Sequence, residues 1–173
     1  RKGHDISQAV GYIAEGLFRD EQEIANSPVQ GGDLMPGDIR YRDVNDDGVV
    51  DVEDAVHIGF PTTPRLIYGF NGFVNYKGLE FSFAFQGSGQ RGFFINPAAM
   101  SPFANNHALL TAIYKDHWST DNMSERPLWP RLSTKNMIEH NPQEDASSDK
   151  ETRMSTYFLR ECRFLRCTSL ELA

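Results

Sequence analysis

Residues 68–85 alternate between apolar and polar side chains, and this alternation restricts the fold more than any other feature of the sequence. Even positions are apolar or glycine in residues 68–76, whereas odd positions are apolar in residues 79–85. A two-residue turn at Lys77 and Gly78 would pair residue 76 with 79, 74 with 81, 72 with 83 and 70 with 85. Every apolar residue except Phe73 then lies on one face of an antiparallel hairpin, as a consistent register requires.

The apolar face of this predicted hairpin is rich in aromatic residues, and two environments would suit it. Tyr68 and Tyr76 lie near its two ends, like the interfacial tyrosines of a lipid-facing barrel strand. The inward face of a soluble β-sandwich would show the same alternation. Periodicity alone favours the sandwich.

Residues 43–54 form an acidic segment with the spacing of an EF-hand-type calcium loop. Oxygen-bearing side chains occupy the first, third, fifth, ninth and twelfth positions, and Gly48 occupies the sixth, where such a loop turns sharply. The sequence therefore predicts Ca²⁺ as a cofactor. The predicted ligands are Asp43, Asn45, Asp47, the backbone carbonyl of Val49, Asp51 and Asp54. The alternative is a solvated acidic turn whose side chains cap the local backbone.

Composition limits the class of protein. The 173 residues suit one domain, and the formal net charge of −7 argues against a nucleic-acid partner. No run of about eighteen apolar residues indicates a spanning helix, whereas the alternating strands of a membrane β-barrel are compatible with the sequence. Nothing at the start of the sequence resembles a signal peptide. Cys162 and Cys167 are too far apart on one strand to form a disulfide, so they do not indicate a compartment.

Shorter patterns predict local structure outside the hairpin. Residues 20–24 suit a short helix that ends at Ser27 and Pro28. Residues 52–58 suit a single helical turn, and residues 106–118 a helix with an apolar side. Residues 157–172 have extended character again.

No arrangement of residues indicates catalysis, and we expect that the protein is not an enzyme. The sequence has neither a nucleophile elbow nor a phosphate-binding loop. Residues 87–92 match Gly-x-Gly-x-x-Gly, but they follow an antiparallel-type hairpin and precede no helical pattern, so the context does not fit a nucleotide site. The histidines are scattered without metal-ligand spacing, at His4, His57, His107, His117 and His140.

An ordered series of short motifs resembles the C-terminal part of the SusC/RagA family of TonB-dependent outer-membrane transporters. The motifs are Gly11-Tyr12, Glu15-Gly16-Leu17-Phe18, Glu23-Ile24, the segment 36–51, Ile58-Gly59, Tyr68-Gly69-Phe70, Phe85-Gln86-Gly87, the segment 118–122, Pro130-Arg131-Leu132, Phe158-Leu159-Arg160 and Phe164-Leu165-Arg166. Each motif is weak, but their order is specific, and they cover nearly the whole chain. The resemblance reverses the sandwich preference, because such hairpins are barrel strands in that family.

The resemblance implies a mainly β fold, with antiparallel strands from part of a transmembrane β-barrel, long loops, a few short helices and the EF-hand-like calcium loop. It implies that residues 1–173 are a partial barrel region that lacks the plug domain and the final strands. The calcium-type loop, residues 43–54, departs from the family's commoner pattern at Asp46, where Gly is frequent, and this leaves the predicted ligands intact.

The same resemblance implies a function and partners. Such transporters reside in the outer membrane of Gram-negative bacteria and take up oligosaccharides or peptides. They work with TonB and with a SusD-like surface lipoprotein, and outer-membrane lipid covers their apolar strand faces. An isolated segment of this kind has an uncovered apolar face and strand edges. It is expected either to self-associate through the hairpin 68–85 or to cover that face with residues 106–118.

An alternative from a different class is a soluble extracellular calcium-binding interaction module of dockerin-like type. Dockerins carry two calcium loops, each leading into a helix, and this sequence shows one such loop. Neither interpretation identifies a particular substrate, because the contacts of a transported molecule would be spread over many loops.

Overall fold

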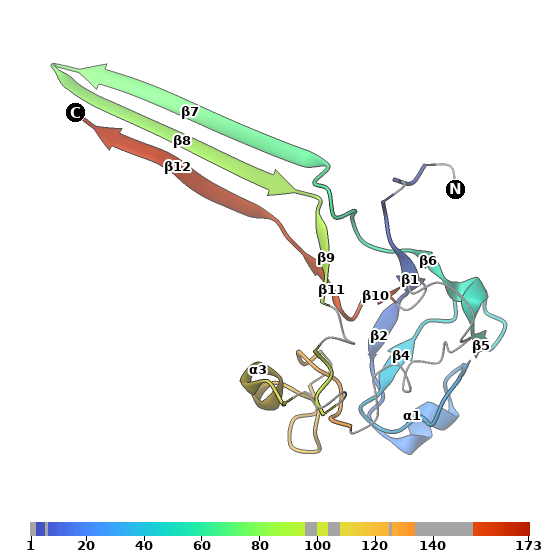
Figure 1. Cartoon of the computed structure of the whole chain (residues 1–173). Helices are drawn as coiled ribbons and strands as arrows, with labels where there is room; N and C mark the ends of the chain where they lie inside the picture. Colours follow the sequence, from blue (N-terminus) through green and yellow to red (C-terminus); the bar gives the residue numbers. More distant parts are fainter. Residues whose placement is uncertain (1–2, 6, 96–99, 104–107, 125, 134–153) are drawn as a thin grey trace. The chain divides into compact units, whose positions relative to one another are not determined.

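The computed structural model describes residues 3–5, 7–95, 100–103, 108–124, 126–133 and 154–173 (Figure 1). These residues are mainly β, with antiparallel sheets and a few short helices, as the sequence predicts. The chain divides into two compact units. The first contains Arg1–Gln8, Gly59–Phe93 and Arg160–Ala173, and the second contains Ala9–Ile58 and Phe94–Leu159.

The predicted hairpin is confirmed in the first unit. Strand β7 (Leu66–Tyr76) pairs with β8 (Leu79–Gly89), and the register contains all four predicted pairs, from Tyr76 with Leu79 to Phe70 with Phe85. Lys77 and Gly78 have φ values of 51° and 85°. Two consecutive positive φ values belong to a type I′ turn, whose twist matches that of the flanking strands. Local turn chemistry and apolar periodicity therefore specify the same register.

A third strand, β12 (Phe164–Leu172), pairs antiparallel with β8 and completes the sheet β12-β8-β7. The register shifts between Cys167 and Ser169, so Thr168 is an extra residue in a β-bulge. Leu165 pairs with Gly87, whereas Leu170 pairs with Phe83. Because the apolar residues of β12 change from odd to even positions across Thr168, the bulge keeps them on one face.

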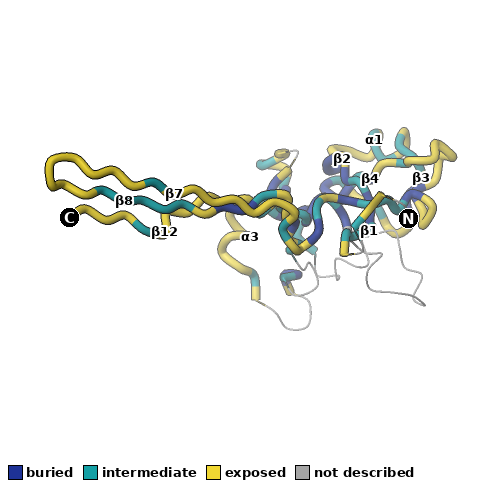
Figure 2. Tube along the Cα trace, turned by 90° about the horizontal axis from the view of Figure 1, so that it is seen from above, coloured by how far each residue is buried: buried dark blue, intermediate teal, exposed yellow. Residues whose placement is uncertain are grey.

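The apolar face of the sheet is built around cross-strand aromatic contacts. The Phe70 and Phe85 rings stack with their centroids 4.9 Å apart. A Cβ atom at Gly72 would lie 2.3 Å from the Phe83 ring, so this glycine leaves space for the ring of its cross-strand partner. Large parts of this face remain exposed, and Val74 is 55% and Tyr76 66% exposed (Figure 2).

The opposite face of the same sheet is largely polar. Asn71, Asn75, Ser82 and Gln86 alternate with the apolar set, and Asn75 donates a hydrogen bond to Glu80 at 2.8 Å. Phe73, which the periodicity singles out as an exception, lies on this face and is 64% exposed. The sheet is therefore amphipathic, with exposed apolar and polar sides.

The second unit is built from short strands around a small aromatic core. Strand β1 (Val10–Tyr12) lies between β10 (Met154–Ser155) and β6 (Val56–His57), and β2 (Ala14–Leu17) pairs with β4 (Ile39–Tyr41). Strands β3 (Val29–Gln30) and β5 (Val49–Val50) form a parallel pair. The cluster of buried core residues contains Tyr12, Ala14, Leu17, Ile39, Tyr41, Val50, Ile113, Trp118, Trp129, Tyr157 and Phe158. Elsewhere, β9 (Gly92–Phe94) pairs with β11 (Leu159–Glu161).

The predicted helices are confirmed only in part. Helix α1 (Glu21–Ala25) begins after Asp20, whose side chain accepts a hydrogen bond from the Glu23 amide at 2.8 Å, and this matches the predicted helix at residues 20–24. In residues 52–58 the 3₁₀ turn η1 (Val52–Asp54) agrees with the prediction, but β6 follows as a strand. In residues 106–118 the described helix is the short α3 (Thr111–Lys115).

The remaining local predictions have mixed outcomes. Residues 106 and 107, and therefore His107, lie outside the described residues, as does His140. Residues 159–161 and 164–172 are strands, in agreement with the extended character predicted for 157–172, and Cys162 lies between them. None of the helices in the described part of the chain has the length and apolar character needed to span a membrane.

The bulge at Thr168 gives the first testable prediction. Deletion of Thr168 removes the extra residue, so only one of the two apolar pairs of β12 can stay on the face that carries Phe83 and Phe85. We expect nuclear Overhauser contacts to survive for either Cys167 with Phe85 or Leu170 with Phe83, but not for both.

The control is Thr168→Val, which keeps the residue count and should preserve both contacts. If both contacts persisted in the deletion variant, the bulge would not be what aligns the apolar residues of β12.

Candidate functional site

The acidic loop 43–54 folds around one buried carboxylate. Asp54 is completely buried, and its Oδ1 accepts hydrogen bonds from the backbone amides of Val44 at 2.7 Å and Asn45 at 3.3 Å. Its Oδ2 accepts from the Asp51 amide at 2.9 Å and completes a capping box around η1. Asp54, the twelfth residue of the loop, thus binds backbone amides from both the beginning and the end of the loop.

The first residue of the loop plays a similar role on its exposed side. Asp43 accepts hydrogen bonds from the Asp46 and Gly48 amides, each at 2.7 Å. Gly48 has a φ of 88°, a left-handed conformation that glycine adopts without steric cost, so the sharp turn predicted at this position is present.

The other predicted ligands also accept local hydrogen bonds. Asn45 accepts from the Asp47 amide at 3.0 Å, and Asp47 accepts from the Val49 amide at 2.8 Å. Asp51 accepts from the Glu53 amide at 2.8 Å.

This geometry resembles the capped acidic turn that the sequence offers as an alternative to a metal site. Among the described residues, no three Asp, Glu, His or Cys side chains are grouped as metal ligands. The loop ends in the three-residue 3₁₀ turn and is followed by a strand, whereas a dockerin loop leads into a helix. A carboxylate oxygen that accepts one amide keeps a second acceptor site, so Ca²⁺ binding here stays a prediction.

A buried ion pair connects two parts of the second unit that are far apart in sequence. Asp38 Oδ1 lies 2.7 Å from Arg131 Nε, and Asp38 Oδ2 lies 3.2 Å from the Nη2 atom of the same guanidinium group. The side chains are only 2% and 16% exposed, respectively. Asp38 Oδ2 also accepts the Met35 amide at 2.9 Å, so the carboxylate both closes a turn and holds Arg131.

The same turn packs against an indole ring. Gly37 has a φ of 92°, and a Cβ atom there would lie 2.3 Å from the Trp118 ring. Its amide donates to the Phe18 carbonyl at 2.7 Å, and its carbonyl accepts from the Arg131 amide at 3.1 Å. Both φ and space therefore require glycine at position 37.

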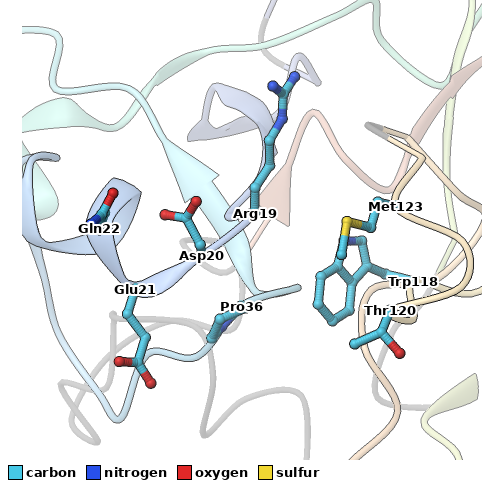
Figure 3. A pocket seen from close by; sticks show the side chains of 8 residues that line it. All are labelled: Arg19, Asp20, Glu21, Gln22, Pro36, Trp118, Thr120 and Met123. Atoms are coloured by element: carbon cyan, nitrogen blue, oxygen red, sulfur yellow. The ribbon is translucent and has the colours of Figure 1, made fainter.

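A cavity of about 450 Å³ opens beside this turn (Figure 3). Its lining combines the start of α1 with the segment that carries Trp118. The lining residues are Arg19, Asp20, Glu21, Gln22, Pro36, Trp118, Thr120 and Met123.

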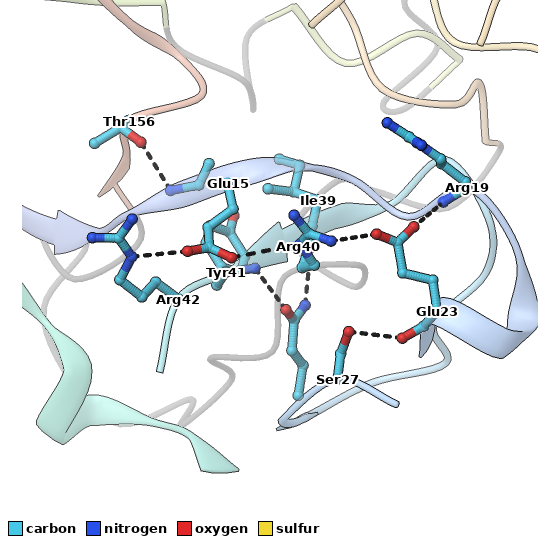
Figure 4. A network of polar contacts seen from close by, with 11 residues as sticks. Glu15, Arg19, Glu23, Ser27, Ile39, Arg40, Tyr41, Arg42 and Thr156 are labelled. Atoms are coloured by element: carbon cyan, nitrogen blue, oxygen red, sulfur yellow. Dashed lines mark hydrogen bonds and ion pairs between the residues drawn. The ribbon is translucent and has the colours of Figure 1, made fainter. Parts of the chain in front are cut away.

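A polar network extends along β2 and β4 (Figure 4). The register between these strands shifts at Glu15, which accepts a hydrogen bond from Arg42 Nε at 2.8 Å and lies 3.6 Å from Arg40 Nε. Arg40 also pairs with Glu23 of α1. The Arg40 to Glu23 pair connects α1 to β4, whereas Glu15 connects β2 to both arginines.

Gln30 completes this network on the buried side. Its Nε2 donates to the Ile39 carbonyl at 2.9 Å, and its Oε1 accepts from the Tyr41 amide at 2.8 Å. The side-chain amide therefore occupies the edge of β4 in the way that a neighbouring strand would. Burial raises the pKa of the adjacent Tyr41 phenol above its ordinary value.

The structure brings the predicted loop residues together but also shows connections that sequence reasoning missed. The turn with Asp38 and the segment with Arg131 both belong to motifs noted in the sequence, but nothing in one sequence pairs them. The only feature of the sequence that could have indicated this pairing is the opposite charge of two residues in turn-rich segments.

Comparison with known proteins relates the chain to one class. It is 36% identical over 86 residues to TonB-dependent receptor P26 of Formosa agariphila, a match that covers 50% of this chain and 8% of that relative. It is 30% identical over 88 residues to TonB-dependent receptor P3 of the same bacterium, covering 51% of this chain and 9% of that relative. No protein-family model matches the chain. The matched segments are thus under a tenth of either relative, and they support a relationship to TonB-dependent receptors without distinguishing the SusC/RagA subfamily.

The calcium prediction is tested by calorimetric titration of the chain with Ca²⁺. We expect one binding site, lost in Asp47→Ala, because this change removes an exposed carboxylate at a ligand position. Mg²⁺ should compete poorly, since it requires a tighter octahedron.

Asp46→Asn is the matched control, because it removes a neighbouring charge outside the ligand pattern and keeps a residue that tolerates positive φ. Absence of heat at millimolar Ca²⁺ would leave the capped acidic turn as the correct interpretation.

The Asp38 to Arg131 pair gives a stability prediction. Arg131→Met leaves a buried carboxylate without its guanidinium partner, so the free energy of unfolding in urea should fall by about 3 kcal/mol or more. Arg126→Met, at an exposed arginine nearby in sequence, should change it by less than about 0.5 kcal/mol. The double variant Asp38→Asn with Arg131→Met should lose less free energy of unfolding than the sum of the losses in the two single variants. If the two losses were strictly additive, the two side chains would not be energetically coupled.

Proposed function

We propose, on the premise of the relationship to TonB-dependent receptors, that this chain is part of an outer-membrane nutrient transporter of the SusC/RagA type. The observation that carries the proposal is the amphipathic sheet β12-β8-β7, whose strands are 9, 11 and 11 residues long. A tilted strand of about 9 to 11 residues crosses the hydrocarbon core of a bilayer. The sheet would be a section of the barrel wall.

The distribution of side chains over the two faces supports this assignment. In a membrane barrel, side chains alternate between lipid and the interior. Phe70, Val74 and Phe83 lie on the face assigned to lipid, whereas Asn71, Asn75 and Gln86 lie on the face assigned to the interior. Tyr68 and Tyr76 are near the two ends of β7, where a barrel strand meets the headgroup region.

The second unit is proposed to lie outside the hydrocarbon core. Its short strands and irregular connections leave backbone groups that need water or protein partners, and lipid supplies neither. Its ion pairs and acidic loop suit an aqueous environment for the same reason.

The complete transporter is proposed to take up oligosaccharides or peptides, with energy delivered through TonB and with a SusD-like lipoprotein as partner. These finer assignments rest on the ordered motifs shared with the SusC/RagA family. Both relatives are named as TonB-dependent receptors, which agrees with a role in transport. Ca²⁺ in the loop 43–54 is proposed as a structural ion that would neutralise its crowded carboxylates.

The proposal is tested by placing a charge on each face of the sheet in the complete transporter. Val74→Asp and Phe83→Asp should reduce the amount of folded barrel recovered from the outer membrane. On the lipid face near the bilayer centre, a charged side chain destabilises a barrel by about 2 kcal/mol or more if it is Arg or Lys, and by less if it is Asp.

Asn71→Asp is the control on the opposite face and should leave assembly unchanged. Equal recovery of all three variants would contradict the assignment of the apolar face to lipid.

A further inference from the structure

The cavity between the start of α1 and Trp118 has a fixed apolar floor. The Trp118 ring packs against Gly37, and the Trp118 amide donates to the Trp129 carbonyl at 3.0 Å. Trp118 is only 9% exposed, so the ring is held in place and presents a small part of its surface. Pro36 adds a second rigid apolar wall.

Met123 forms the adaptable side of the same cavity. It is 56% exposed, and Figure 3 shows it beside Trp118, on the wall opposite the start of α1. An unbranched thioether side chain repacks easily around an inserted group, and methionine is therefore frequent on surfaces that bind apolar side chains. Trp, Met and Arg, all present here, are also enriched at protein interfaces.

The rim of the cavity on the α1 side is acidic. Asp20 and Glu21 are exposed there, and only Arg19 offers an opposite charge in the lining. Glu23, the next acid of the first helical turn, is already paired with Arg40. Glu21 forms no ion pair within the described part of the chain. An incoming group therefore meets an apolar floor and a negative edge.

We propose that this cavity is a docking site for a protein partner that inserts an apolar side chain flanked by a Lys or Arg residue. The apolar group occupies the space against Trp118, Pro36 and Met123, and the basic group pairs with Glu21. The volume of about 450 Å³ accommodates one large side chain together with its neighbour.

The chemistry of the lining favours a polypeptide over a small polar ligand. A small-ligand site holds its ligand with a few fixed, convergent polar groups. Here Asp20 is engaged in capping α1, and Thr120 and Gln22 are exposed at the rim. The inference goes beyond the proposed transport function, because it concerns the second unit alone and does not require that the sheet meets lipid.

The test is methyl NMR of the full chain labelled at methionine, with the Met123 signal assigned from Met123→Leu. The probe is the dipeptide acetyl-Leu-Lys-amide, and the comparators are acetyl-Leu-Glu-amide, acetyl-Ser-Lys-amide and maltose. We expect acetyl-Leu-Lys-amide to shift the Met123 methyl signal in a saturable way and to bind about two- to five-fold more tightly than acetyl-Leu-Glu-amide, as an exposed charge pair allows. Acetyl-Ser-Lys-amide, which lacks the apolar anchor, should cause no saturable shift.

A charge reversal separates docking from general electrostatics. Glu21→Lys should invert the order of the two leucine dipeptides. Glu53→Lys changes the net charge equally at an exposed site outside the cavity, and it should leave the order unchanged. The Met35 methyl, exposed and outside the lining, should not shift.

Three outcomes would overturn the proposal. The Met123 signal could fail to respond to any dipeptide, or the preference for lysine could persist unchanged in Glu21→Lys. A saturable response to maltose with none to the dipeptides would instead assign the cavity to a carbohydrate. Unchanged membrane assembly of the Val74→Asp and Phe83→Asp variants would contradict the transport proposal alone.

Discussion

The ion pair between Asp38 and Arg131 is the contact on which the second unit depends most. It joins residues 93 positions apart, and Asp38 simultaneously closes the turn that holds Gly37 against Trp118. Loss of either partner would leave a charge in a nearly dry site, where an unpaired ion is far more costly than a missing surface contact. The pair therefore acts as a constraint on where the segment with Trp118 and Trp129 can pack.

Backbone amides play the corresponding role in the acidic loop. Asp54 and Asp43 accept five amide hydrogen bonds between them, so donors from the chain itself offset part of the negative charge. A cation and these amides are not exclusive, because carboxylate oxygens can accept from both. The loop thus turns sharply at Gly48, and its own carboxylates cap its backbone amides.

The sheet β12-β8-β7 is governed by a different constraint. Apart from exposed apolar residues such as Phe73 and Ile67 on the polar side, its two faces differ in polarity, so neither water nor lipid alone suits both faces. The bulge at Thr168 and the glycine opposite Phe83 both maintain this separation. A sheet between lipid and an aqueous interior would satisfy both faces, and this gives the transporter proposal a physical basis beyond sequence similarity.

The sequence by itself determined those elements that depend on residues close together in the chain. The hairpin register follows from two-residue periodicity and the turn at Lys77 and Gly78, and the start of α1 follows from the cap at Asp20. The shape of the acidic loop follows from its glycine and its acceptor spacing. Only the tertiary structure decided that residues 56–57 form a strand instead of continuing a helical turn, because β6 pairs there with β1. The same holds for the partners of Asp38, Gln30 and β12, since long-range pairings depend on which chain segments pack together, and one sequence carries no direct record of this.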